Sequence, residues 1–455
     1  MTRSEPNKFS AGVARWFSVV AALAVLLVPA VARAAITGET GTSFSLTARA
    51  GYISIADGGS VYSWGYSTGS QMQLPGPTLI VTAGQTVTVT LANNLPAAAG
   101  NVSIVFPGHQ VTAMPNTGVP GLLTQEAQPG GTVTYTFTAG EPGTYQYHSG
   151  TRPDLQVEMG LYGALVVRPS VAAAGCADAA HTAYNHAATC FDREYLYLLS
   201  EVDLEVHRAA EQQASGPGPI DVGDGPFHPE YWLLNGRAAP DTMAAAGDPL
   251  LPTQPYNAMT RMHPGERLLL RVVGAGRDMH PFHTHGNHVR VLARDGRLLL
   301  SATDATKLAG PLLFTIPSVP GGTVDAIFEW TGKDLGWDIY GTTALNPHTC
   351  IPDASGYHSV AADPNYREWC ADHNRPIPVN LPDLSVLAFG GFYSGSPYLG
   401  ALGSLPPGEG GLNPDAGYAY MWHSHTEREM VNNDVFPGGM MTMLIIEAPG
   451  VLIVE

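Results

Sequence analysis

Charged residues are scarce in this 455-residue sequence, and most of them are acidic. Asp and Glu number 39 against 22 Lys and Arg, so the formal net charge is −17 at pH 7. Nucleic acids and anionic lipids attract basic surfaces, and a balance this acidic argues against binding to either. We therefore expect no nucleic-acid partner and no polybasic membrane patch.

Long apolar runs are also scarce. Only the stretch 16–30 is strongly apolar, and Pro29 interrupts it before it reaches the length of a membrane-spanning helix. Basic residues precede this run and Ala32-Arg33-Ala34 follows it, which is the three-part layout of a secretory signal peptide. Residues 1–34 carry a net charge of +3, so the mature chain carries −20. We predict that it is periplasmic or secreted, with no integral membrane segment.

Cysteine is rare as well, with four residues in the whole chain. None lies in a Cys-x-x-Cys motif, a pattern that would favour thiolate metal ligands. Cysteines outside the cytoplasm form disulfides by default. We expect Cys176 to pair with Cys190 and Cys350 with Cys370, because they are near in sequence, although four cysteines permit three connectivities.

Amphipathic helices are hard to find, and short β-type runs take their place. Between residues 36 and 170, alternating Val and Thr segments are separated by turns rich in Gly and Pro. A second series begins near Tyr195, with a strand predicted over 195–206, and repeats the order of the first. We interpret this as an internal duplication of one β-sandwich, because the mature chain is too long for one core.

The pattern predicts an all-β protein with two β-sandwich domains, at 36–170 and 193–455, joined by a disulfide-tied linker at 171–192. Residues 331–416 break the second series and are rich in Gly, Pro, Asn and Asp. Unstructured insertions of this length are uncommon and are often lids or binding loops. The sequence leaves open whether this insertion covers a site or lies at an edge.

Histidine is concentrated in HPFHTHGNH, residues 280–288. On an extended strand, side chains two residues apart share a face and stand about 7 Å apart, so His283 and His285 can point at one metal ion. MWHSHTERE repeats the arrangement with His423 and His425. Two such pairs on neighbouring strands would present four neutral nitrogens, which suit copper, zinc, nickel or iron.

Several segments together resemble the multicopper oxidases, which are built from cupredoxin domains. They are PGPTLIVTAGQTVTVTLANNLP, GTYQYHSG with GLYGALVV behind it, HPFHTHG, and the terminal MWHSH with GGMMTMLII. The resemblance covers about residues 40–170, 195–330 and 417–449. It implies two cupredoxin-like Greek-key β-sandwich domains, the second with a long loop insertion. It also implies copper: a blue copper bound by His, Cys and His, and a three-copper cluster held by four His-x-His pairs that reduces dioxygen to water.

Only part of that cluster's ligand set is present. The first pair is replaced by Val105 and Pro107, and the second keeps His148 but has Gly150 as its partner. The third and fourth pairs are intact. Because the missing ligands all lie in the first domain, we expect a mononuclear or at most binuclear copper site at the domain junction. Its expected ligands are His283, His285, His423, His425 and His148.

The blue copper position departs further from the family. His280 remains, but Ser424 stands where the cysteine is required and Glu429 where the second histidine is required. Blue copper needs a thiolate as a soft ligand and as the electron path, and a serine hydroxyl supplies neither. We therefore predict no blue copper and no laccase-type turnover.

Three further residues are considered as additional ligands. His109 shares the strand parity of Val105 and competes with a turn assignment, because Pro107-Gly108 interrupts the strand. We expect His280 to be either a neighbour of the metal site or one of its ligands. We expect Glu429 to be either a ligand or a group that orients an imidazole ligand. The other histidines fit no ligand spacing and are expected at the surface or in loops: His181, His186, His207, His228, His263, His348, His358 and His373.

Two functions from different classes follow. One is a copper-dependent oxidoreductase that binds dioxygen or another small molecule at an open position on the metal. The other is a non-catalytic copper protein, for binding, buffering or delivery, or a structural cupredoxin scaffold. The resemblance also leaves a homo-oligomer open, because two-domain relatives often form trimers with the cluster between chains.

Overall fold

Strands make up most of the regular structure, which confirms the all-β fold class. The structure is a computed structural model that describes residues 36–374 and 418–453, except residues 224, 337, 341, 342 and 345. The predicted signal peptide, residues 1–34, and residues 375–416 of the predicted insertion lie outside the described residues.

The first half of the chain forms two sheets that share one core. The four-stranded sheet has the order β1 (Glu39–Thr40), β4 (Gly76–Thr82), β11 (Tyr162–Arg168) and β10 (Gly143–His148). The five-stranded sheet has the order β3 (Ser60–Ser67), β2 (Ser43–Ser54), β5 (Thr86–Asn93), β9 (Thr132–Thr138) and β6 (Val111–Met114). A short hairpin pairs β7 (Val119–Pro120) with β8 (Gln125–Glu126). On β5, Val87, Val89 and Leu91 are buried in alternation with less buried threonines, as expected for a strand with one face on a core.

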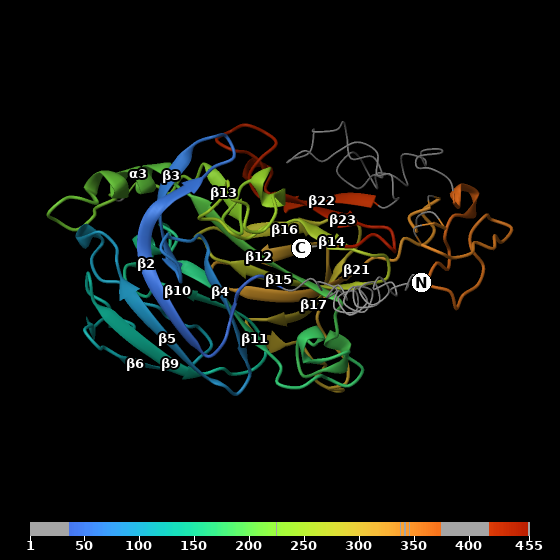
Figure 1. The fold of residues 1–455 in the computed structure, drawn as a ribbon, viewed down its shortest axis with the longest axis horizontal. Coiled ribbons are helices and arrows are strands. Elements are labelled where there is room, and N and C mark those ends of the chain that lie inside the picture. Colours follow the sequence, from blue (N-terminus) through green and yellow to red (C-terminus); the bar gives the residue numbers. More distant parts are fainter. Residues whose placement is uncertain are drawn as a thin grey trace, which may run out of the picture. The chain divides into compact units, whose positions relative to one another are not determined.

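The second half also forms two sheets, one of seven strands and one of five. The seven-stranded sheet has the order β13 (Tyr231–Leu234), β12 (Arg193–Val202), β15 (Arg267–Gly274), β21 (Thr323–Glu329), β17 (Val289–Arg294) and β18 (Arg297–Leu298), with β19 (Leu312–Leu313) also paired to β17. The five-stranded sheet has the order β14 (Thr260–Met262), β23 (Met441–Ile446), β22 (Tyr418–Ser424), β16 (His280–Thr284) and β20 (Thr315–Ser318). Figure 1 shows β14, β16, β22 and β23 gathered together. The two histidine motifs therefore lie on neighbouring strands.

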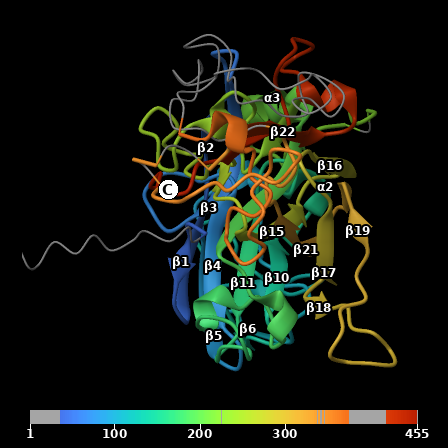
Figure 2. The same cartoon turned by 90° about the vertical axis from the view of Figure 1, so that its right-hand side faces the viewer.

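A third core joins the two halves, with Ile80 and Val166 from the first half against Leu198 and Val273 from the second. In Figure 2, β4, β11 and β10 lie side by side, and β10 contacts β15 and β21. Ala34–Ile453 forms one compact unit by its contacts, so the boundary between two domains stays a prediction.

Both predicted disulfides are confirmed, Cys176 with Cys190 and Cys350 with Cys370. The segment that holds the first disulfide is packed against the second half, because Tyr184 and Phe191 share a core with Leu269 of β15.

The strand predicted over 195–206 was too long. β12 ends at Val202, and helix α3 (Leu204–Gln213) begins two residues later. The Asp203 carboxylate accepts hydrogen bonds from the backbone N–H groups of Glu205 and Val206, which is the N-cap arrangement that starts a helix.

The remaining helical segments are short. They are α2 (Pro153–Gln156) and the 3-10 turns η1 (Ala97–Ala99), η2 (Ala179–His181), η3 (Ala187–Thr189), η4 (Asp241–Met243), η5 (Cys370–Asp372) and η6 (Glu427–Met430). Among the described residues, none of the helices has the length and apolar character that crossing a bilayer requires.

Candidate metal centre

Four histidines gather where β16 and β22 run side by side. His283 and His423 are direct partners in this antiparallel pair, so their side chains leave the sheet on the same face. His285 and His425 follow two residues later on each chain segment. The ring centroid of His283 lies 4.7 Å from that of His285, 5.4 Å from that of His423 and 4.8 Å from that of His425. The ligand atoms of His283, His285 and His423 all lie within 4.8 Å of one another.

The surrounding groups orient these rings toward one another. His423 donates its Nδ1–H to the backbone carbonyl of Ser424 at 2.6 Å, which leaves Nε2 as the atom with a free lone pair. This Nε2 lies 3.2 Å from Nε2 of His285. Nδ1 of His283 lies 2.8 Å from the Thr315 hydroxyl, which can accept the Nδ1–H and leave Nε2 to bind a metal. The ligand atoms of His283, His285 and His423 therefore face one shared point. The ring of His425 lies beside them, but its ligand atom is outside this group and its Nδ1 lies 3.3 Å from Oε1 of Glu427, so its role as a ligand stays a prediction.

The surroundings of His283 and His423 lower the pKa of both side chains and favour their neutral form. Burial, together with the neighbouring His285, His423 and His425, lowers the pKa of His283 to about 4. Burial also lowers the pKa of His423. Neutral imidazoles are the form that binds metals, and a set of several such nitrogens without thiolates fits copper.

An open cavity of about 420 Å³ lies beside the histidines. Its lining residues are His283, Thr284, His285, Gly286, Asn287, His288 and Phe314. The Phe314 ring packs against the rings of His283 and His288, at centroid distances of 5.7 Å and 5.3 Å. A small molecule can reach the histidines from this side.

His148 lies at the end of β10, in the first half. It donates its Nδ1–H to the carbonyl of Ser149 at 2.9 Å, as His423 does to Ser424, and burial lowers its pKa. In each half, therefore, a histidine donates its Nδ1–H to the backbone carbonyl of the serine that follows it. The group of ligand atoms within 4.8 Å of one another does not include His148, so its role as a ligand stays a prediction.

Apolar packing occupies the positions of the missing histidines in the first half. Val105 is paired through its backbone with His148. A Cβ atom added to Gly150 would meet Cγ1 of Val105 at 2.7 Å. The space for a side chain at position 150 is therefore filled by the valine, and the first half offers no His-x-His pair here.

The three positions of the expected blue copper do converge, but they form an ion network. His280 is fully buried, with Nδ1 2.9 Å from Oε2 of Glu429 and Nε2 2.9 Å from Oε2 of Glu201. The Ser424 hydroxyl donates to the same Glu429 oxygen at 2.5 Å. Burial by itself lowers the pKa of His280, but hydrogen bonds to the two carboxylates and their negative charges outweigh it and raise the pKa to about 9.

These residues do not fit a blue copper. Both ring nitrogens of His280 face carboxylates, and no sulfur is present. His280 and Glu429, considered above as additional ligands, are thus engaged with each other and not with the histidine group. Glu201 was not among the site residues predicted from the sequence. An acidic residue inside the apolar run YLYLLSEV of β12 is the pattern that indicates a buried partner.

His109 lies apart from these groups, in the first half. Its ring packs against Phe137 and Tyr145, with centroids 4.9 Å and 4.7 Å away, and its Nδ1 lies 3.3 Å from the carbonyl of Pro107. Burial lowers its pKa.

Some histidines left as surface or loop residues are placed differently. His207 is buried on α3, so the surface-or-loop prediction was wrong for it. His358 is buried as well, but it lies in a loop, as that prediction allowed. His348 and His373 lie together with Glu368 in the predicted insertion, and their ligand atoms form a second compact group. No spacing motif joins them, since they are distant along a segment without strands.

Comparison with known proteins agrees with this fold. A family model described as "Multicopper oxidase" matches residues 54–171. The chain is 40% identical over 98 residues to multicopper oxidase MCE of Talaromyces pinophilus, which is 21% of this chain and 15% of that protein. It is 40% identical over 95 residues to copper resistance protein A of Pseudomonas syringae pv. tomato, which is 21% of this chain and 14% of that protein. The matched stretches thus span about a seventh of these relatives.

A solved structure, the blue copper oxidase from Nitrosomonas europaea, superposes with a TM-score of 0.52 at 19% identity, and the match covers 91% of this chain and 87% of that one. At this identity the likeness shows a shared fold. The matched family model and the relatives show, in addition, that residues 54–171 are similar to multicopper oxidases.

Proposed function

We propose that this protein is an exported copper-binding member of the family, with one histidine copper site and no blue copper centre. The observation that carries the proposal is the convergence of four imidazoles at β16 and β22, while the blue copper positions form a buried ion network. Copper held by His283, His285, His423 and His425 would supply one-electron redox chemistry and an exchangeable position.

The chain's own residues would tune this site. The Ser424 carbonyl and the Thr315 hydroxyl hold the rings of His423 and His283 by their Nδ1 atoms. The Trp422 indole donates to the backbone carbonyl of His285 at 2.9 Å and so fixes the chain where β16 ends. The site is thereby shaped before a metal binds, which lowers the cost of binding.

Two activities are compatible with such a site. The open cavity of about 420 Å³ supports a copper-dependent oxidoreductase that takes dioxygen or another small molecule as substrate. The absence of a thiolate relay supports instead a non-catalytic role in copper binding, buffering or delivery, because multi-electron reduction of dioxygen has no electron path. Both activities require copper binding, and copper binding is the function that we conclude.

Export is the second part of the proposal. The layout of residues 1–34 is that of a secretory signal peptide, and both cysteine pairs of the chain form disulfides. Disulfides persist in oxidising compartments and are rare in the cytoplasm, so they support a periplasmic or secreted protein.

The copper site is tested by measuring the metal content and the optical and spin-resonance spectra of the purified full chain. We expect about one copper per chain, as the four-histidine set predicts, and no intense blue absorption. H283A and H423A should each weaken copper binding at least about tenfold, since each removes a direct ligand. H228A, which removes an exposed histidine outside the group, is the matched control and should bind copper like the wild type.

Copper retained fully by both ligand variants would remove the proposed site, and a blue protein would contradict the reading of His280. Oxygen uptake in the presence of phenols or other reductants then separates the two activities. If the wild type consumes oxygen and H423A does not, the protein is an oxidoreductase. If the copper-loaded protein consumes no oxygen, the non-catalytic role is correct.

A further inference from the structure

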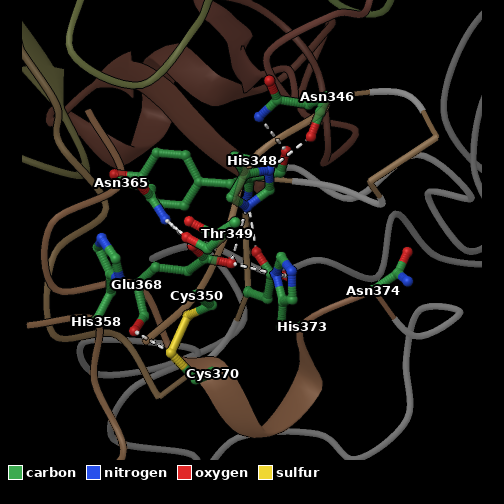
Figure 3. Close-up of polar contacts among 12 residues, drawn as sticks. Asn346, His348, Thr349, Cys350, His358, Asn365, Glu368, Cys370, His373 and Asn374 are labelled. Carbon is green, nitrogen blue, oxygen red and sulfur yellow. Dashed lines mark hydrogen bonds and ion pairs between the residues drawn. A yellow bond between two sulfur atoms is a disulfide. The ribbon is translucent and has the colours of Figure 1, made fainter. Parts of the chain in front are cut away.

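A second cluster of metal-ligating side chains lies in the predicted insertion, outside the copper site. Figure 3 shows His348, Glu368 and His373 close together, beside the disulfide between Cys350 and Cys370. One ligand atom from each of the three residues lies within 4.8 Å of the others. We name these three residues the insertion cluster.

The distances in the insertion cluster are close to those around a bound ion. Nε2 of His348 lies 3.1 Å from Oε1 of Glu368, and Nδ1 of His373 lies 3.0 Å from the same oxygen. Ligand atoms at about 2.1 Å from a tetrahedral zinc ion are separated from one another by about 3.4 Å. Small movements of the side chains would therefore complete a site.

Hydrogen bonds around the insertion cluster fix which atoms face inward. His348 donates its Nδ1–H to the backbone carbonyl of Asn346 at 2.6 Å. Nε2 of a neutral His348 is then an acceptor, yet it faces a carboxylate oxygen, which is also an acceptor. Two acceptors at 3.1 Å repel each other unless a cation or an additional proton lies between them. The arrangement calls for a positive charge at this point.

Glu368 is held in the same way from its other side. The Asn365 side-chain amide donates to Oε2 of Glu368 at 2.5 Å and to the carbonyl of Thr349 at 2.9 Å. Oxygen Oε1 is left for the two histidines. Outer hydrogen bonds of this kind, on a histidine and on a carboxylate, are what orients the ligands of metal sites.

Negative charge is buried around the insertion cluster. The side chain of Glu368 is 0% exposed and that of Asp338 is 5% exposed. Oδ2 of Asp338 lies 4.0 Å from Nδ1 of His373. Within the described part of the chain, both carboxylates make their ion pairs with histidines and none with Lys or Arg. Buried carboxylates without a fixed cation are costly, and a metal ion removes that cost.

We propose that His348, Glu368 and His373, with Asp338 as the fourth ligand, bind one zinc ion separate from the copper site. Two imidazoles and two carboxylates in a tetrahedral arrangement suit zinc, whereas divalent copper prefers a tetragonal arrangement. Ile339 and Tyr340, next to Asp338, are buried in the core of the second half. The ion would thus tie residues 346–373 of the insertion to that core.

The test uses the full chain, stripped with a chelator, reloaded with one equivalent of copper to occupy the four-histidine site, and then titrated with zinc. The wild type should bind one zinc at the insertion cluster, and E368Q and H348Q should each bind it at least about tenfold more weakly. D178N is the matched control, because it removes the carboxylate of the His181–Asp178 pair beside the other disulfide, a pair that is not part of the insertion cluster. It should bind zinc like the wild type.

Cobalt substitution gives a readout that does not depend on affinity. Cobalt bound to the wild type should show the absorption of a tetrahedral site with nitrogen and oxygen ligands, and E368Q should lose it. Near-ultraviolet circular dichroism and a thiol count establish that each variant has folded with its disulfides. If E368Q does not fold, H348Q replaces it in the cobalt experiment.

The zinc and copper sites are separated by crossing the variants. H423A should lose copper and keep zinc, whereas E368Q should lose zinc and keep copper. Folded wild type that binds no zinc would overturn the proposal, as would zinc retained by both E368Q and H348Q. Zinc lost in H423A would place the ion among the copper-site histidines and would also overturn it.

Discussion

At the scale of the residue, two histidines three positions apart on β16 have opposite properties. His280 is enclosed by the carboxylates of Glu201 and Glu429, which favour its charged form. His283 is enclosed by other imidazoles and partly buried, and both effects favour its neutral form. The difference in surroundings makes one an internal cation and the other a metal ligand.

The His280 ion network predicts a dependence of stability on pH. The pKa of His280 is about 9 in the folded protein and about 6.5 in the unfolded chain, so its contribution is complete below about pH 6.5 and is lost as the pH rises through 9. This difference corresponds to roughly 3 kcal/mol in the free energy of unfolding. Denaturant unfolding of the metal-free protein at about pH 6 and above pH 9 measures it.

E429Q is the comparison for this prediction, because it keeps a hydrogen-bonding group at the position and removes one charge. Burial raises the pKa of Glu158 to about 8, which acts in the same direction in both proteins, so the difference between them reports the His280 network. E429Q should lose less stability than the wild type as the pH rises. Equal losses would contradict the assigned role of Glu429.

At the scale of the element, a buried charge network joins strands of the two halves. Arg271 on β15 is fully buried, with Nε 3.0 Å from Glu194 of β12 and Nη1 3.0 Å from the hydroxyl of Thr144 on β10. The Thr144 hydroxyl donates to Asp325 of β21 at 2.6 Å. β10 of the first half is thereby fixed against two strands of the second half.

We predict that R271M destabilises the protein by about 3–5 kcal/mol, because it removes the buried cation that Glu194 and Asp325 share and leaves Arg168 as the cation paired with Glu194. R267M, on the same strand, removes a partly exposed arginine that pairs with the exposed Glu329, and should cost no more than about 1 kcal/mol. Denaturant unfolding of the three proteins at neutral pH measures both values. An R271M protein as stable as R267M would show that the network does not hold the halves together.

At the scale of the whole molecule, each metal site combines segments that are far apart in the sequence. The copper site needs β16 and β22, and the predicted insertion separates them along the chain. The insertion cluster needs Asp338 at one end of its segment and His373 at the other. Both sites therefore require the folded chain, with its disulfides formed.

At this scale we predict that the chain is exported and that its four cysteines are oxidised to disulfides. Expressed in a bacterial host, the chain should reach the periplasm without residues 1–34 and with no free thiol, as mass spectrometry before and after alkylation would show. A chain that begins at Ala35 behind a new Met should stay in the cytoplasm with reduced cysteines. A periplasmic protein that keeps residues 1–34 would contradict the signal-peptide assignment.

The sequence by itself determined the all-β fold, the two His-x-His pairs and the missing thiolate, and it favoured the two disulfide pairs that the structure contains. Each of these depends on a period of two residues, a short spacing or the identity of one residue. Such local patterns can be recognised without knowing which distant segments pack against them. The start of α3 was missed although its cap is local, because the apolar run of β12 continues across Asp203.

Only the tertiary structure decided which distant groups meet. Glu201 faces His280, Val105 fills the space beside Gly150, and His348 meets His373 across a segment without strands. These contacts depend on how sheets and loops pack. The sequence spacing of residues many positions apart does not indicate that they will meet. The histidine motifs could therefore be predicted, whereas the carboxylates that charge His280 and the insertion cluster could be found only once the chain was folded.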